Sequence, residues 1–132
     1  MPFRALALLP VLLVLVGCHS ALADAMASYE DARYPTAAAQ FRALEPTARR
    51  LGARDFASYA LHRGLTHLAL GDARAAALWL GHAKVSADRD PDIFDAEERG
   101  ALLAAWRSMG HMPGEPGFGN AGTSRRASAA NP

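Results

Sequence analysis

The chain has 132 residues, of which 51% are hydrophobic, and its 14 Lys and Arg residues nearly balance its 13 Asp and Glu residues. This length suits one domain of modest size, and a net charge of only +1 excludes a strongly basic nucleic-acid-binding surface as the basis of function. Because the chain contains a single cysteine, it cannot form an intramolecular disulfide, so its stability depends on side-chain packing.

The N-terminus has the features of an export signal. Arg4 supplies a positive flank, and residues 5–16 are apolar apart from a break at Pro10. This run is shorter than the ~20 apolar residues that a membrane-spanning helix needs, and a short apolar run behind a positive charge is typical of a signal peptide. We therefore predict that the chain leaves the cytoplasm.

The apolar run ends in the segment Leu15-Val16-Gly17-Cys18, which resembles the lipobox of bacterial lipoproteins. The resemblance implies that residues 1–17 are a lipoprotein signal peptide and that Cys18 becomes the diacylated N-terminus. Two or three acyl chains hold a protein stably on a bilayer. Since His19 is not the Asp that retains such proteins in the inner membrane, the resemblance implies the periplasmic face of the outer membrane.

An ordinary signal-peptide cleavage site is the alternative. The segment Ala21-Leu22-Ala23 is followed by Asp24, and small residues in an A-x-A pattern are typical of such a site. Cleavage there would discard Cys18. Both interpretations place the mature chain outside the cytoplasm.

The rest of the chain up to Met109 is predicted to be helical, because Ala, Leu, Arg and Glu dominate it and no run alternates β-branched with polar residues. We therefore predict an all-α fold without strands. Pro46 and Gly52 are expected to interrupt the pattern, so that residues 47–54 form a loop or one helical turn. The expected N-caps are Asp55, Asp72 and Asp90. The predicted helices cover residues 22–33, 36–45, 55–70, 73–86 and 91–109.

The Gly71-Asp72 pair predicts a tight antiparallel hairpin between two of these helices, with Gly71 as the left-handed stop. This hairpin resembles a tetratricopeptide repeat, a helix-turn-helix unit of about 34 residues. Gly64 matches the small residue that lets the two helices approach each other. The packing positions of the second helix are matched by Ala76, Leu80 and Ala83.

A weaker copy of the repeat lies upstream, where Ala37, Phe41 and Leu44 align with those three packing positions. The chain departs from the family pattern at Ala60, where the family prefers a large aromatic residue, and at His67, where it prefers Tyr. The resemblance implies a short array of helical hairpins within residues 18–110. The last helix would cap this array through an apolar stripe made of Leu102, Ala105, Trp106 and Met109.

Residues 111–132 are rich in Pro, Gly, Ser, Ala and Asn, and their only bulky apolar residues are Met112 and Phe118. Such a segment cannot bury enough apolar area to offset its chain entropy. We predict a disordered C-terminal tail.

The sequence contains no recognisable catalytic or metal-binding constellation. His62 and His67 are separated by about 140° around a helix, so they cannot share a metal ion as an i, i+4 pair can. The acidic residues Asp95, Glu97 and Glu98 lie near the start of the last predicted helix, where they complement its dipole. We therefore expect no enzymatic activity, no cofactor and no bound metal.

The leading interpretation is a lipoprotein that serves as an adaptor or assembly factor for an envelope machine. Small tetratricopeptide lipoproteins of this appearance resemble the pilotins of secretion systems and pili, so the expected partner is an envelope protein or peptide and not a nucleic acid. The first helix of each pair lines the inner surface of such arrays. The candidate partner-binding residues are therefore Tyr29, Tyr59, His62, Arg63 and His67, with Trp79 as a further candidate hot spot.

The alternative is a structural or regulatory envelope lipoprotein without a catalytic role, which would work as an oligomer packed through its Ala-rich faces. A subunit of a cell-wall hydrolase is disfavoured, because no paired acid and base are present. Tyr59 and Arg63, one helical turn apart, are the pair that we expect to anchor a partner.

Overall fold

The computed structural model describes residues 9–111, with side chains from Ser20 onward. This part of the chain contains no strand and forms five helices: α1 (Leu9–Glu30), α2 (Tyr34–Ala48), α3 (Ala53–Ala69), α4 (Ala73–Arg89) and α5 (Ala96–Ser108). The prediction of an all-α fold with about five helices is therefore confirmed. The predicted disordered tail, apart from His111, lies outside the described residues.

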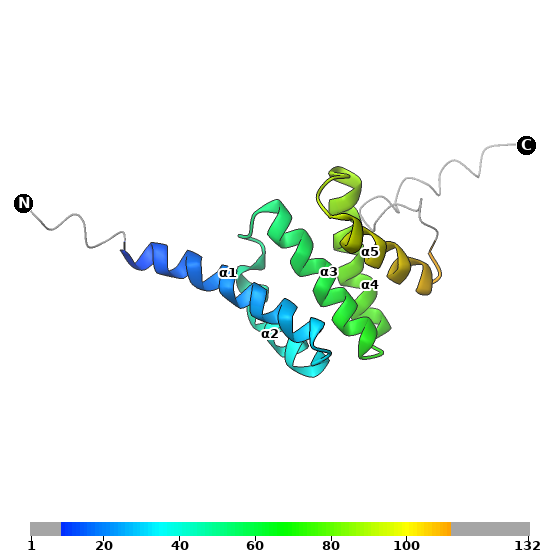
Figure 1. Ribbon diagram of the computed structural model, residues 1–132, viewed down its shortest axis with the longest axis horizontal. Helices are drawn as coiled ribbons and strands as arrows, with labels where there is room; N and C mark the ends of the chain where they lie inside the picture. Colours follow the sequence, from blue (N-terminus) through cyan, green and yellow to red (C-terminus); the bar gives the residue numbers. More distant parts are fainter. Residues whose placement is uncertain (1–8, 112–132) are drawn as a thin grey trace, which may run out of the picture.

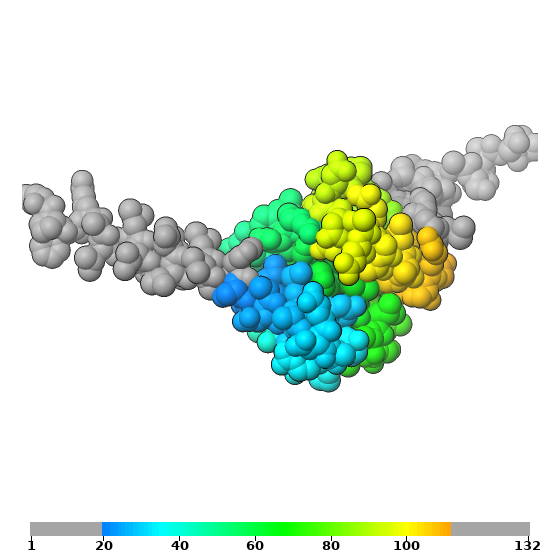
Figure 2. All heavy atoms as spheres, viewed as in Figure 1, coloured from blue at the N-terminus to red at the C-terminus, as the bar shows by residue number. Residues whose placement is uncertain are grey.

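The helices form two antiparallel hairpins and a fifth, covering helix (Figure 1). Helices α1 and α2 make the first hairpin, α3 and α4 make the second, and α5 packs against the second. Helix α3 contacts each of the other four helices, and in Figure 2 the first hairpin and the α4–α5 segment cover most of it from the side shown. The architecture is thus organised around α3.

Two apolar clusters lie on either side of α3. The first joins α1, α2 and α3 through residues that include Leu22, Phe41 and Tyr59, and the second joins α3, α4 and α5. Trp106 and Leu102 of α5 are buried in the second cluster, as the predicted capping stripe requires. The six aligned packing positions are also buried: Ala37, Phe41, Leu44, Ala76, Leu80 and Ala83.

The turn between α3 and α4 has the predicted geometry. Gly71 adopts a φ of 77°, in the left-handed region that glycine adopts without steric cost. The carboxylate of Asp72 accepts a hydrogen bond from the amide of Ala75 at 3.1 Å and so caps α4. Gly71 and Asp72 therefore have the predicted roles.

Helices α3 and α4 are in close contact at Gly64. A Cβ atom added at Gly64 would lie 2.6 Å from Cγ of Leu80 and 2.9 Å from the backbone nitrogen of Leu80. Because a backbone atom is among these neighbours, a side-chain rotation would not relieve the clash. The small residue matched to the repeat pattern thus lies where the two helices are in contact.

The predicted boundaries of the first two helices were wrong: α1 begins at Leu9, well before the predicted residue 22, and the other ends differ by a few residues. Helix α1 ends at Glu30, and Ala32 turns the chain with a φ of 57°. Helix α2 then runs through Pro46 to Ala48. Pro46 is tolerated because it lies in the last turn with its ring exposed, so that it removes one hydrogen bond near an end, while continuation of the helix buries Ala48.

Two predicted N-caps were also wrong. Helix α3 begins with Gly52 at its N-cap, so that Asp55 lies inside the first turn, and α4 extends past the predicted end at residue 86 to Arg89. Helix α5 is capped by Asp95 and not by Asp90, because Asp95 accepts a bond from the Glu98 amide at 2.8 Å and Glu98 accepts one from the Asp95 amide at 3.2 Å.

The segment between α4 and α5 explains why the earlier cap is not used. The carboxylate of Asp90 accepts a hydrogen bond from the amide of Asp92 at 3.1 Å, which favours a turn at this point. The turn directs Ile93 and Phe94 into the second apolar cluster. Burial of these two side chains, together with the capping box at Asp95, stabilises the later helix start.

Replacement of Gly64 by Ala is expected to destabilise the fold by about 1–3 kcal/mol, because the new methyl group overlaps the backbone of α4. The matched control is Gly100→Ala in α5, where a Cβ meets nothing within 4 Å and the gain in helix propensity is ~0.5–1 kcal/mol. Chemical denaturation measures both free energies of unfolding. Equal effects of the two substitutions would contradict the close contact.

Candidate functional site

A cluster of four side chains joins the two hairpins. The Nη2 atom of Arg63 on α3 lies 2.8 Å from Oε2 of Glu45 on α2, and its guanidinium carbon lies 4.1 Å from the ring centroid of Trp79 on α4. Arg63 also donates a hydrogen bond to the hydroxyl of Tyr59. We call Glu45, Tyr59, Arg63 and Trp79 the Arg63 cluster.

Tyr59 connects this cluster to the first hairpin. Its hydroxyl donates to the backbone carbonyl of Phe41 at 3.1 Å, and its ring makes edge contacts with those of Phe41 and Trp79. Burial raises the pKa of the Tyr59 hydroxyl, while the nearby charge of Arg63 opposes that shift. The phenol therefore stays protonated and keeps its donor role.

The expectation that Tyr59 and Arg63 form an exposed pair for a partner is wrong. Tyr59 is 0% exposed and Arg63 is 6% exposed, because their shared face of α3 points at α2 and α4. Trp79, the further candidate hot spot, is partly buried and packs against both apolar clusters. The three residues do come together, but as an internal junction.

The other candidate residues lie apart from this cluster. His62 is buried, with Nδ1 2.9 Å from the Ser58 carbonyl oxygen, and its ring meets that of Tyr29 edge to face. Nδ1 of His67 lies 3.8 Å from Oδ2 of Asp72 near the end of α3. The structure thus places the six candidates in three locations. Cys18 lies in α1, but its side chain is outside the described residues, whose side chains begin at Ser20.

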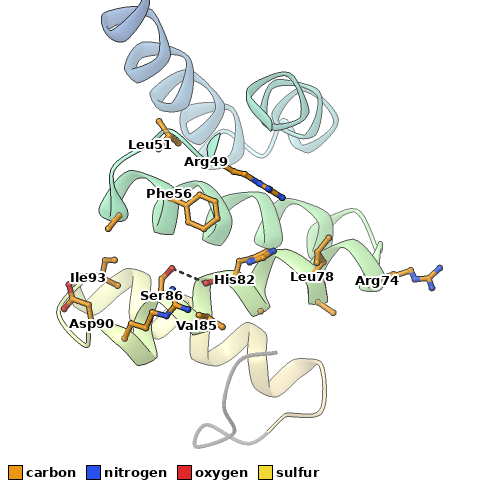
Figure 3. A pocket seen from close by; sticks show the side chains of 14 residues that line it. Arg49, Leu51, Phe56, Arg74, Leu78, His82, Val85, Ser86, Asp90 and Ile93 are labelled. Atoms are coloured by element: carbon orange, nitrogen blue, oxygen red, sulfur yellow. Dashed lines mark hydrogen bonds between the residues drawn. The ribbon is translucent and has the colours of Figure 1, made fainter. Parts of the chain in front are cut away.

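An open groove of about 940 Å³ lies beside the Arg63 cluster (Figure 3). One wall is a face of α4 on which groove-lining residues recur at the three- and four-residue spacing of a helix: Arg74, Ala77, Leu78, Gly81, His82, Val85, Ser86 and Arg89. The opposite wall combines the α2–α3 connection with the start of α3: Arg49, Leu51, Ala53 and Phe56. Asp90 and Ile93 close one end. We call this feature the α4 groove.

The floor of the α4 groove is apolar and its rim is basic. Phe56, Val85 and Leu51 are partly buried in it, whereas Leu78 is 54% exposed. The guanidinium groups of Arg49, Arg74 and Arg89 make no ion pair with any residue that the structure describes. Desolvation lowers the pKa of His82, and the charge of Arg49 lowers it further. Arginines outnumber the carboxylates in the groove lining, where Asp90 at one end is the acidic residue.

The groups that meet in this groove suit noncovalent binding. Guanidinium groups around an apolar floor favour a ligand with both carboxylate or phosphate groups and apolar surface. Within the described residues, no three His, Cys, Asp or Glu side chains gather as a metal site would require. None of the helices in residues 9–111 is both long and apolar enough to cross a membrane.

No protein family, curated protein or solved structure was found to match this chain. The likeness of its hairpins to tetratricopeptide repeats is accordingly a resemblance of sequence pattern. Its function has to be inferred from its own residues and their geometry.

Sequence reasoning missed the α4 groove, although a signal for it was present. The apolar residues of α4 form two stripes, and only Ala76, Leu80 and Ala83 belong to the one matched to the repeat. Ala77, Leu78 and Val85 lie on the second stripe. A helix that is apolar on two faces has a second surface to cover. The basic wall supplied by Arg49 comes from another element, so only the tertiary structure shows it.

Replacement of Arg63 by Ala is expected to lower the free energy of unfolding by about 2–4 kcal/mol, since charge-assisted hydrogen bonds and the packing against Trp79 are lost together. The matched control is Arg33→Ala, which removes an exposed ion pair with Asp31 and is expected to change stability by less than ~1 kcal/mol. Thermal or urea unfolding measures the difference. An effect of Arg63→Ala as small as that of the control would contradict the junction role.

Stability is expected to fall as the pH drops below neutrality. The pKa values of His67 and His82 are lowered in the folded chain, chiefly by desolvation, so the unfolded chain binds protons first as the pH falls through ~6.5. The stabilisation that comes from keeping these two histidines neutral is complete above pH ~6.5. It is lost as the pH falls from the ordinary pKa of histidine to the lowered pKa values of the folded chain. Unfolding measured from pH 7.5 to 5.5 should show a flatter profile for the double variant His67→Gln, His82→Gln. An unchanged slope would contradict this origin.

Proposed function

We propose that this protein is a lipid-anchored adaptor of the bacterial cell envelope, which binds a peptide or helix of another envelope protein. The observation that carries the proposal is the position of the lipobox-like segment within α1, directly before the part of that helix that packs against the fold. Leu15-Val16-Gly17-Cys18 ends only three residues before Ala21, which packs against the first apolar cluster. Anchor and binding domain would thus be directly joined.

The short connection has a mechanical consequence. Cleavage after Gly17 would leave Cys18, His19 and Ser20 before the first packed residue, a span of ~10 Å even when extended. A diacylated Cys18 would therefore hold the helices against the bilayer surface. Such a placement suits a protein that presents a binding surface to partners in or on the same membrane.

Burial of Leu22 supports the lipoprotein cleavage site over the ordinary one. Leu22 is 4% exposed and packs with Ala25, Phe41 and other residues of the first apolar cluster. Cleavage after Ala23 would remove Leu22, and loss of a buried leucine side chain typically costs 2–5 kcal/mol. Cleavage after Gly17 leaves that cluster complete.

An adaptor role also agrees with the chemistry of the described residues. The buried polar side chains of α3 are engaged within the fold, as the Arg63 cluster illustrates. What remains accessible is a groove with an apolar floor and a basic rim. These groups bind and orient a ligand without transferring protons or groups, so we propose a non-catalytic protein.

The Cys18→Ala variant is expected to lose incorporation of a radiolabelled fatty acid and to leave the membrane fraction, because the acylated thiol would be absent. Fractionation and fatty-acid labelling measure both effects. The matched control is His19→Ala, which keeps the lipobox and should keep the label. A wild-type chain without lipid, whose mature N-terminus by mass spectrometry is Asp24, would contradict the proposal.

A further inference from the structure

Within residues 20–111, no element of the fold covers the second stripe of α4. The first stripe, made of Ala76, Leu80 and Ala83, is fully buried against α3 and α5. The second stripe faces the α4 groove, where Leu78 projects from the helix (Figure 3). Among the described residues, two large apolar side chains are exposed, and Leu78 is the more exposed of them. Leu78 lines the same groove as Leu51, Phe56, Ala77 and Val85. A contiguous apolar patch of this kind, unlike a single exposed leucine, is expected where another apolar surface docks.

The positive charges of the groove have a definite spacing. Arg74 and Arg89 lie in the first and last turns of α4, which separates them by ~22 Å or about four helical turns. Arg49 stands on the opposite wall. Since all three lack an ion-pair partner among the described residues, each is available to an anionic group.

We infer that the α4 groove binds an amphipathic helix of a partner protein, about four turns long, with apolar side chains against Leu78 and Val85 and acidic residues at both ends. This inference deepens the proposed adaptor function and rests on it for the identity of the ligand class. The apolar stripe supplies the contact area, and the arginines at the two ends set the register and direction of the helix.

Charge complementarity selects this occupant over the others. A phospholipid carries its charge at one end, so it would satisfy one end of the groove and leave the other without a partner. The chain's own residues 112–132 contain Arg125 and Arg126 against the single acidic residue Glu115, which does not complement a basic rim. In a second copy of the chain, α5 has acidic residues in its first turn only, and its apolar stripe is already buried.

The test uses the purified mature chain and a fluorescently labelled synthetic helix of about sixteen residues, with leucines at three- and four-residue spacing and two glutamates at each end. Fluorescence anisotropy measures its dissociation constant. We expect binding that weakens as salt is added, and weakens tenfold or more when Gln replaces every Glu. Equal affinity of the Glu and Gln peptides, or no binding of either, would overturn the inference.

Substitutions then locate the site. Leu78→Asp, and separately Arg74→Glu with Arg89→Glu, should each weaken binding at least about tenfold, equivalent to ~1.4 kcal/mol. The matched control is Leu70→Asp, which alters the other exposed large apolar residue, at 44% exposure and outside the groove, and should leave affinity unchanged. A helix with lysines at its ends should bind the double charge reversal better than wild type. Circular dichroism verifies that each variant is folded.

The remaining outcomes assign the groove elsewhere and would overturn the inference. Binding of phosphatidylglycerol vesicles that Leu78→Asp abolishes, without peptide binding, would indicate a lipid site. If light scattering gives the mass of a dimer and Leu78→Asp reduces it to that of a monomer, a second copy of the chain occupies the groove. If the peptide binds only after residues 112–132 are removed, the chain's own C-terminal segment occupies the groove. Because the peptide assay does not depend on the anchor, failure of lipidation at Cys18 and failure of the groove are separately visible.

Discussion

The Arg63 cluster holds the two hairpins of this protein together, because Arg63 on α3 pairs with Glu45 on α2 and the Tyr59 hydroxyl donates to the carbonyl of Phe41 on α2. One guanidinium group reaches Glu45 on α2, Trp79 on α4 and the hydroxyl of Tyr59 on its own helix. A buried charge is tolerated only where several groups compensate its lost hydration. Tyr59 and Trp79 belong to the same hairpin as Arg63, whereas Glu45 belongs to the other, so all of these contacts of the guanidinium group form only when the hairpins are docked in one arrangement.

That junction determines where function is to be sought. It uses the aromatic and guanidinium groups that are most often hot spots in interfaces, and it uses them internally. The side chains that a partner can reach therefore lie in the neighbouring α4 groove. The Arg63 cluster adjoins this groove, because the ring centroids of Trp79 and the groove residue His82 lie 5.4 Å apart. A change at the junction would alter the floor of the groove as well as the stability of the fold.

The contact of Gly64 with Leu80 sets the rotation of α4. With Leu80 held against α3, a residue two positions away points to roughly the opposite side, because each residue turns a helix by about 100°. Leu78 is thereby directed to the surface together with the rest of the second stripe. One close helix contact thus explains both a core and an exposed apolar face on the same helix.

The sequence by itself determined the features that depend on neighbours along the chain. The all-α class, the turn at Gly71 with its cap at Asp72, and the capping stripe of α5 follow from backbone propensity and a 3.6-residue period. The capping box of Asp95 and Glu98 is also a local pattern, but the sequence analysis placed the cap at Asp90 instead. Only the tertiary structure decided that Pro46 stays within α2, that Arg63 and Tyr59 turn inward, and that Arg49 faces α4 across a groove. The physical reason is that burial, ion pairing and a shared cavity are contacts between residues far apart in sequence. Their free energy belongs to the packed arrangement and not to any one segment.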